Sequence, residues 1–352
     1  MNLQSWTQYL TSWISSSTAA WSVRAATLEF YGQQTKQEAL CREAERYYAH
    51  ALQIQQARIR AYTEKPKGDS NKPNEAPTEE DVSASLMLMY YELLRPTFTG
   101  SWMTHLRGTV ELLILRGAQS CQEGLGHLVF RSLRLLMAHV SIRTQLSPCF
   151  ASFDWRTVPF YRGQKTALDA IPDAIYKLSL LLKYTDVNIN TVSQHGLEPH
   201  LQTIVDEVIL SEHIYALEIP SQETTWHHFP FNFNRDDKHE DMLWLGGGDF
   251  CSLTPSVAYH AVWIMIYHLK LSIPLNNCTT DQAAANESIA RASFLLDFLG
   301  DLFRRNLHTK LNVGSCIQLV FPMEVVSWYS PCANQRKKAR AYLDQLGWMQ
   351  SF

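Results

Sequence analysis

The sequence predicts an all-α fold, a large multi-helix bundle built from helical hairpins. Apolar residues recur every three or four positions along most of the 352 residues. The sustained two-residue alternation of a half-buried strand does not stand out. Capping residues and prolines punctuate the periodic segments. We expect a single domain over residues 1–352, with an N-terminal helical segment at 1–35, a core at 36–346, and long loops near 63–78 and 219–254.

The N-terminal region is expected to be helical over Leu3–Phe30, in one or two pieces. Its large apolar anchors are Trp6, Trp13 and Trp21. A second, amphipathic helix is expected over Lys36–Tyr62, because its apolar residues recur at helical spacing while Glu, Gln and Arg occupy the other faces. Lys65–Pro77 is rich in Pro, Lys, Asn and Gly, which is typical of a surface loop.

The stretch from Thr78 to Gly117 predicts a helical hairpin. Thr78 is suited to the N-cap position, and the acidic residues that follow it favour the positive end of a helix dipole. Pro96 cannot donate a backbone hydrogen bond, so the first helix should stop there. Ser101 offers a second N-cap, and Gly117 offers a left-handed residue that ends the second helix.

The rest of the chain continues the helical pattern. The expected helices are Leu125–Leu146, one starting near Pro172, Leu197–Leu217, Ser256–Leu271, Asp281–Asn306, Val313–Trp328 with a bend at Pro322, and Asn334–Leu346. Ser256–Leu271 is apolar on nearly every face, which predicts a central buried helix. Phe150–Phe160 reads as an aromatic connector, and Ile219–Thr254 reads as a long loop.

Composition excludes several classes of partner. The net charge is −3 and 46% of the residues are hydrophobic, so no global electrostatic attraction to nucleic acid or to an anionic membrane is expected. The longest apolar run, Val257–Leu269, is too short to span a bilayer. The seven cysteines include no CxxC pair, which favours reduced thiols in the nucleus or cytosol over disulfides or a local zinc site.

No stretch carries a specific catalytic signature. The acidic residues Asp236, Asp237 and Glu240 fit a magnesium site, but no second metal-binding motif follows them, so a solvated loop is the favoured interpretation. Nearby histidines lack the spacing of a compact two-histidine site, and packing is favoured for them. We therefore assign no catalytic, cofactor or metal-binding residue, and we do not expect an enzyme.

A short basic run lies near the C-terminus. Its cations are Arg336, Lys337, Lys338 and Arg340. They form a candidate nuclear-import patch, but the same helix is expected to bury Ala339 and Leu343, so the basic residues also fit its solvent-exposed face. The solvent-face interpretation is favoured.

Several motifs together resemble a known family. The hairpin residues Trp102, His105, Gly108, Arg116 and Gly117 follow the pattern W-x2-H-x2-G…R-G. Looser matches are the apolar helix Leu86–Glu92 ending in Tyr-Glu, the Tyr-x2-Ala-Leu element within Tyr47–Leu52, and the closing segment Phe321–Val325. These motifs are similar to the fungal-specific transcription factor domain, which is the regulatory domain of fungal zinc-cluster transcription factors.

The resemblance implies an all-helical regulatory or effector-sensing domain in transcription, serving a metabolic or secondary-metabolite pathway and located in the nucleus, with the cytoplasm as the alternative. It implies transcription proteins or a DNA-binding partner as partners, and a small-molecule effector. No membrane partner is expected, given the composition and the short apolar run. We interpret the hairpin positions as structural, with Trp102 supplying core area, Gly108 a close helix approach, and Arg116 and Gly117 the helix end. His105 is expected to be packed or hydrogen-bonded in the bundle.

The chain departs from the family in one respect. Family members usually carry an N-terminal six-cysteine zinc cluster, and no cysteine precedes Cys41 here. Direct sequence-specific DNA binding by this chain alone is therefore not expected. The remaining interpretations are a regulatory domain that has lost its DNA-binding zinc cluster, a truncated chain, or a co-regulator that acts through a partner. Outside the family, the alternatives are an all-α magnesium-dependent enzyme and a cytosolic helical scaffold.

Overall fold

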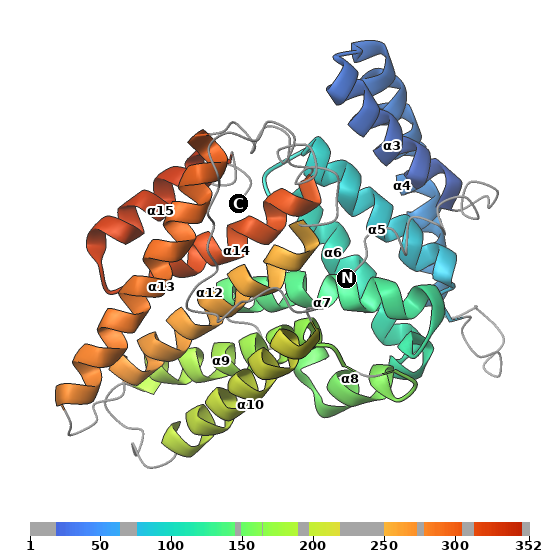
Figure 1. The fold of residues 1–352 in the computed structure, drawn as a ribbon. Coiled ribbons are helices and arrows are strands. Elements are labelled where there is room, and N and C mark those ends of the chain that lie inside the picture. The colour runs from blue at the N-terminus through green and yellow to red at the C-terminus, as the bar shows by residue number, and fades with distance from the viewer. Residues whose placement is uncertain are drawn as a thin grey trace. The chain divides into compact units, whose positions relative to one another are not determined.

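The computed structural model describes residues 19–63, 76–144, 149–163, 165–188, 197–218, 250–272, 278–304 and 313–346 (Figure 1). Twelve α-helices and three short 3-10 helices occupy these ranges, and the described residues include no strand. The prediction of an all-α multi-helix fold is confirmed. No helix in the described ranges is both long and apolar enough to cross a membrane.

The contacts of the chain separate it into two compact units. The N-terminal unit comprises residues 2–134 and 152–164, and the C-terminal unit comprises residues 135–151 and 165–349. The helix α7 (Gly124–Thr144) begins in the first unit and ends in the second. The expectation of a single domain stays a prediction.

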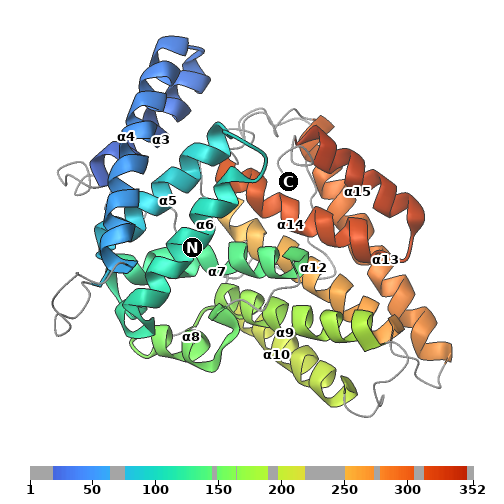
Figure 2. The same cartoon turned by 180° about the vertical axis from the view of Figure 1, so that it is seen from behind.

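The N-terminal unit is built from two helical hairpins. α3 (Ala19–Thr35) and α4 (Glu38–Thr63) form the first, and α5 (Glu79–Leu94) and α6 (Ser101–Arg116) form the second. Both hairpins are visible from either side of the molecule (Figures 1 and 2). Shorter elements complete this unit, namely η1 (Ala118–Cys121), α8 (Phe153–Thr157) and η3 (Val158–Phe160).

Small residues allow the helices of the first hairpin to approach closely. Four alanines of α3 are buried, namely Ala19, Ala20, Ala25 and Ala26. A β carbon added to Gly32 would lie 2.7 Å from the Cys41 sulfur and 3.2 Å from the Cys41 backbone nitrogen, so a larger residue would force the start of α4 or the Cys41 side chain to shift. α3 and α4 correspond to the helices expected over Leu3–Phe30 and Lys36–Tyr62. α3 continues beyond Phe30, and residues 1–18 lie outside the described ranges.

The ends of the second hairpin follow the sequence closely, with one exception. Thr78 caps α5 through a reciprocal pair of hydrogen bonds with Asp81, and α5 ends at Leu94, just ahead of Pro96. The predicted N-cap of α6 at Ser101 is wrong, because Gly100 occupies that position in a left-handed conformation with φ 77° and ψ 10°. Ser101 is instead the first helical residue, and its hydroxyl donates to the Glu92 carboxylate.

The C-terminal unit is organised around one apolar helix. This is α12 (Phe250–Ser272), which packs against α9 (Ala167–Asn188) and α14 (Val313–Tyr329) and against α13 (Cys278–Arg304). Ten of its residues, including all six of Ala261–Ile266, are buried, which confirms the predicted central helix. η2 (Cys149–Ala151), α10 (Leu197–Glu218) and α15 (Ala333–Gln345) complete the unit.

The largest differences from the predicted helices concern α9, α12 and the connector 150–160. α9 begins at Ala167, ahead of Pro172, because Thr166 and Asp169 cap it with side-chain hydrogen bonds of 2.7 and 2.9 Å. α12 begins at Phe250, within the stretch expected to be a loop. The aromatic connector Phe150–Phe160 is itself largely helical, since it contains α8 and η3.

Candidate functional site

Three of the motifs that carry the family resemblance meet in one cluster of the N-terminal unit, around the buried carboxylate of Glu92. The Tyr48 hydroxyl of α4 donates to the Glu92 carboxylate of α5, and it lies 3.2 Å from Nε2 of His105 on α6. The Tyr48 ring also stacks on Tyr91, with ring centroids 4.1 Å apart. We call Tyr48, Glu92, Thr97, Ser101 and His105 the Glu92 cluster.

Hydrogen bonds satisfy the Glu92 carboxylate on both oxygens. Glu92 has no exposed surface, and it accepts from the Thr97 amide at 2.8 Å, from the Thr97 hydroxyl at 2.8 Å, and from the hydroxyls of Ser101 and Tyr48. A buried carboxylate is costly unless donors compensate for its lost hydration. The cluster therefore closes the α5–α6 turn and attaches α4 to it.

The protonation states within the cluster follow from these bonds. Burial raises the pKa of Tyr48 well above its ordinary value, and the Glu92 carboxylate raises it further, so the phenol stays protonated. Because its one proton is donated to Glu92, the Tyr48 oxygen accepts from His105, which assigns the proton of neutral His105 to Nε2. Burial lowers the pKa of His105, and the nearby Glu92 opposes this shift.

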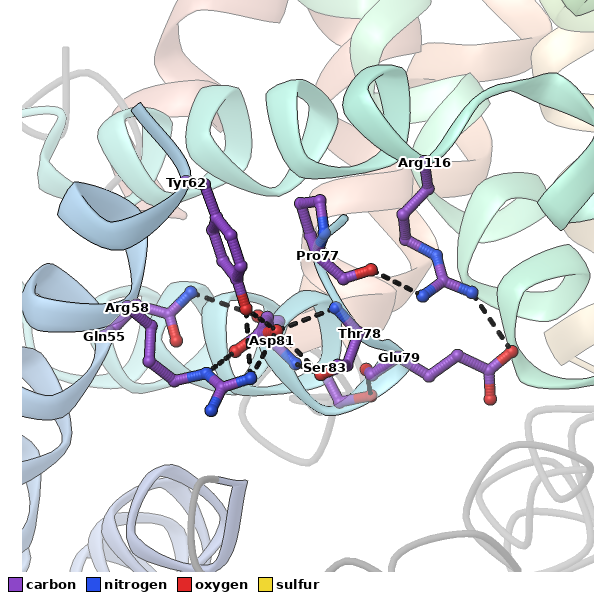
Figure 3. A network of polar contacts seen from close by, with 9 residues as sticks. All are labelled: Gln55, Arg58, Tyr62, Pro77, Thr78, Glu79, Asp81, Ser83 and Arg116. Atoms are coloured by element: carbon purple, nitrogen blue, oxygen red, sulfur yellow. Dashed lines mark hydrogen bonds and ion pairs between the residues drawn. The ribbon is translucent and has the colours of Figure 1, made fainter. Parts of the chain in front are cut away.

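A second buried carboxylate lies in the first turn of α5 (Figure 3). Asp81 has no exposed surface and is held by an Arg58 fork from α4, with Nη2 at 3.0 Å, and by the Tyr62 hydroxyl at 2.5 Å. The Thr78 amide and hydroxyl donate at 2.7 and 2.6 Å. Gln55 adds a hydrogen bond of 3.1 Å to the Asp81 carbonyl. We call these residues the Asp81 cluster.

The electrostatics of the Asp81 cluster favour the charged carboxylate. Burial alone would raise the pKa of Asp81, but the hydrogen bonds from Arg58, Thr78 and Tyr62 outweigh burial and lower it. Burial, together with the bond to Asp81, raises the pKa of Tyr62 to about 12. α4 is thus joined to α5 by one buried acid near each end of α5, Asp81 at the start and Glu92 at the end.

The other hairpin positions have distinct environments. Trp102 is 1% exposed, as expected for a residue that supplies core area. Arg116 donates to the Pro77 carbonyl at 2.7 Å and lies 3.7 Å from the Glu79 carboxylate, so it links the end of α6 to the start of α5 (Figure 3). The sequence predicts Arg116 at a helix end, but it does not predict the contacts of Arg116 with Pro77 and Glu79.

The two hairpin glycines differ in what their positions require. Gly117 ends α6 with φ 82° and ψ 156°, a region reached almost only by glycine, although it is not the left-handed helical conformation expected from the sequence. A β carbon at Gly108 would lie 3.7 Å from the Ser85 hydroxyl, which is ordinary van der Waals contact. A close helix approach therefore does not require glycine at Gly108.

We expect the substitution Gly117→Ala to lower the free energy of unfolding by about 1–3 kcal/mol, because alanine would hold a strained backbone conformation. Gly108→Ala is the matched control on the same helix. It should leave stability unchanged or raise it by up to about 1 kcal/mol, since alanine is the better helix former. Chemical denaturation followed by circular dichroism measures the stability of both variants. Equal losses of stability would contradict the different backbone requirements of Gly117 and Gly108.

The closing motif Phe321–Val325 contains a third buried acid, in the C-terminal unit. Glu324 is 2% exposed and binds Nε2 of His139 and, at 2.7 Å, Nη1 of Arg143, both on α7. The sequence predicts only a closing helix for this segment. The bond joins residues 185 positions apart, so no local pattern predicts it.

The basic run lies on a regular helix. Lys337, Lys338 and Arg340 are exposed on α15, whereas Ala339 and Leu343 are buried. Arg336 donates to the Ser330 carbonyl at 2.6 Å. This placement agrees with the solvent-face interpretation, and a role in nuclear import stays a prediction.

The candidate metal site at Asp236, Asp237 and Glu240 lies outside the described residues, as do the neighbouring histidines. Within the ranges that the structure describes, no group of three His, Cys, Asp or Glu side chains is placed to hold a metal ion. The four cysteines whose side chains are described, namely Cys41, Cys121, Cys149 and Cys332, are free thiols.

The sequence carries one signal for these clusters. Glu92 and Glu324 are single acids within apolar helical stretches, at positions that the periodicity assigns to a buried face. A buried acid needs donors, so each predicts a polar partner on a neighbouring helix. The identity of that partner is set by tertiary packing.

Comparisons with models of protein families, with curated proteins and with solved structures find no match for this chain. A functional assignment therefore rests on the residues and the geometry described above.

Proposed function

We propose that this chain is the regulatory, effector-sensing helical domain of a fungal zinc-cluster type of transcription factor, acting in a metabolic or secondary-metabolite pathway. One observation supports the proposal most. The resemblance was found in separate stretches of sequence, and Tyr48, Glu92 and His105 from three of them are hydrogen-bonded to one another. Motif residues that share one cluster are expected to belong to one structural unit.

The chemistry of the clusters supports a regulatory role more than a catalytic one. The carboxylates of Glu92 and Asp81 are saturated with donors from the protein, which leaves them little capacity to bind a substrate. Buried polar networks of this kind specify how helices meet. An effector that favours one helix arrangement would shift the population of that arrangement and change which surface is presented.

The proposal includes a nuclear location and a partner that reads DNA or belongs to the transcription machinery. Direct sequence-specific DNA binding by this chain is not part of it. Because the net charge is −3, recruitment through a protein partner is favoured over attraction to the phosphate backbone.

A reporter assay tests this function. We expect the full chain, fused to an unrelated DNA-binding module in a fungal host, to change expression of a reporter carrying the matching site at least severalfold, in either direction. The module alone at equal abundance is the control. Exclusion of the tagged chain from the nucleus, together with no reporter change when import is supplied by the module, would support the cytosolic scaffold instead.

A further inference from the structure

The first hairpin carries a cluster of aromatic side chains on its surface. Trp21 of α3 contacts two rings of α4, with its ring centroid 5.4 Å from that of Tyr47 and 4.5 Å from that of His50. Trp21 and Tyr47 are half-buried, and His50 is exposed. The guanidinium carbon of Arg24 lies 5.6 Å from the Trp21 centroid and 5.9 Å from the Tyr47 centroid, within the range of a cation–π interaction. We call these four residues the Trp21 cluster.

Arg24 lacks the acid partner that neighbouring arginines have. Arg42, Arg46 and Arg58 of α4 each form an ion pair with a carboxylate. Arg24 is exposed, and its guanidinium has neither an ion pair nor a hydrogen-bond acceptor among the described residues. Contact with aromatic rings leaves the N–H groups of a guanidinium available for bidentate binding of a carboxylate. The cluster therefore presents one cation whose charge is not compensated within the described part of the chain.

Apolar side chains continue this surface along α3. Leu28 and Tyr31 follow Arg24 at the i+4 and i+7 positions, so they lie on the same side of the helix. Leu28 is half-buried, and Tyr31 is 56% exposed. The surface thus combines a cation that lacks an acid with a row of accessible apolar side chains.

The Trp21 cluster is ordered before any partner binds. Four of the first five residues of α3 are buried, so the backbone that carries Trp21 and Arg24 is held by packing. The ring contacts restrict the Arg24 side chain, so less rotamer entropy is lost when its guanidinium is bound. Trp, Tyr and Arg are also the residues most enriched at the energetically dominant positions of protein interfaces.

We propose that the Trp21 cluster, together with Leu28 and Tyr31, is a docking surface for an acidic segment of a protein partner in which apolar residues alternate with the acids. A carboxylate of the segment accepts hydrogen bonds from Arg24, and its apolar side chains cover Leu28 and Tyr31. Charge complementarity identifies this occupant, because the surface supplies a cation without an acid. The surface does not depend on the proposed role in transcription.

Single-stranded nucleic acid is the competing occupant, since its bases stack on aromatic rings and its phosphates bind arginine. Such binding uses a groove of several cations that follows the backbone, whereas the Trp21 cluster supplies a single uncompensated one. The net charge of the chain is also −3. These observations favour the protein segment.

Fluorescence anisotropy on the full chain tests the surface. The probe is a short labelled peptide that alternates aspartate and leucine, and the comparison peptide carries asparagine in place of aspartate. We expect the aspartate peptide to bind about fivefold more tightly, the upper value for an exposed ion pair. Arg24→Gln should remove this preference, and Arg24→Lys should keep only part of it, because lysine lacks the planar pair of donors. Arg340→Gln, at an exposed arginine of α15, is the matched control and should keep the preference in full.

An NMR measurement locates the binding independently of any arginine variant. The indole N–H resonance of Trp21, identified by its loss in Trp21→Phe, should shift when the aspartate peptide is added. The docking surface is overturned if neither peptide binds, if the two bind equally, if the preference survives Arg24→Gln, or if the Trp21 resonance does not move. Tighter binding of a labelled oligothymidylate than of the aspartate peptide, lost in Arg24→Gln, would also overturn it and would assign the surface to single-stranded nucleic acid.

Discussion

Replacing Asp81 with alanine is expected to lower the free energy of unfolding of the N-terminal unit by about 2–4 kcal/mol, because it removes charge-assisted hydrogen bonds worth about 1.5–3 kcal/mol and an N-cap interaction worth about 1 kcal/mol. Asp81 is fully buried and takes both arms of the Arg58 fork together with the Tyr62 hydroxyl. Its loss removes the carboxylate that accepts these hydrogen bonds and also removes the N-terminal cap interaction with Thr78. Denaturant unfolding followed by circular dichroism measures the loss.

The pH dependence of the same variant provides an independent check. The pKa of Asp81 is lowered in the folded chain, so its contribution to stability is fully present above the unfolded aspartate value of about 4. That contribution is lost as the pH falls through the lower folded value. Wild type and Asp81→Ala should therefore converge in stability as the pH is lowered from 5 to 2.

Glu80→Ala is the control for the helix dipole. Glu80 lies beside Asp81 in the first turn of α5, and no ion pair to it is found among the described residues. Its removal should cost about 0.3–1 kcal/mol, the value of a dipole interaction alone. Comparable losses for Glu80→Ala and Asp81→Ala would mean that the Arg58 pairing contributes little.

The sequence was sufficient to predict the helices because the information that defines them is local. Thr78 and Pro96 bound α5 as their chemistry requires, and the apolar residues of Ser256–Leu271 correctly indicated a buried helix. Thr166 and Asp169 carry the same T-x-x-D spacing as Thr78 and Asp81, so the earlier start of α9 was also encoded locally. Pro172 lies within the second turn of α9 and does not mark its start.

The clusters were not predictable in the same way, because their partners are distant in sequence. The Tyr48–Glu92 bond spans 44 residues, and only the antiparallel packing of α4 on α5 brings them together. The difference between Gly108 and Gly117 is likewise invisible in the sequence, since both occur in one motif. The difference between the two glycines depends on the backbone angles and on the space around each α carbon, which only the structure gives.

The interpretation of Trp102 as a source of core area leads to the second large prediction. Trp102 is 1% exposed and is among the largest fully buried side chains described. Trp102→Ala should lower the free energy of unfolding of the N-terminal unit by about 3–5 kcal/mol, because it removes buried apolar area and leaves a cavity. Hydrogen exchange of α6 amides, combined with denaturant unfolding, reports the loss.

Leu115→Ala is the matched truncation on the same helix, at a side chain that is 59% exposed. It should change stability by less than about 0.5 kcal/mol, as surface substitutions usually do. Trp102→Phe keeps most of the apolar surface, so its loss in free energy of unfolding should lie between those of Trp102→Ala and Leu115→Ala. If all three variants lost similar free energy of unfolding, the loss would come from a general weakening of α6 and not from the burial of Trp102. If Trp102→Ala kept wild-type stability yet abolished the reporter response, Trp102 would act in effector recognition and not in the core.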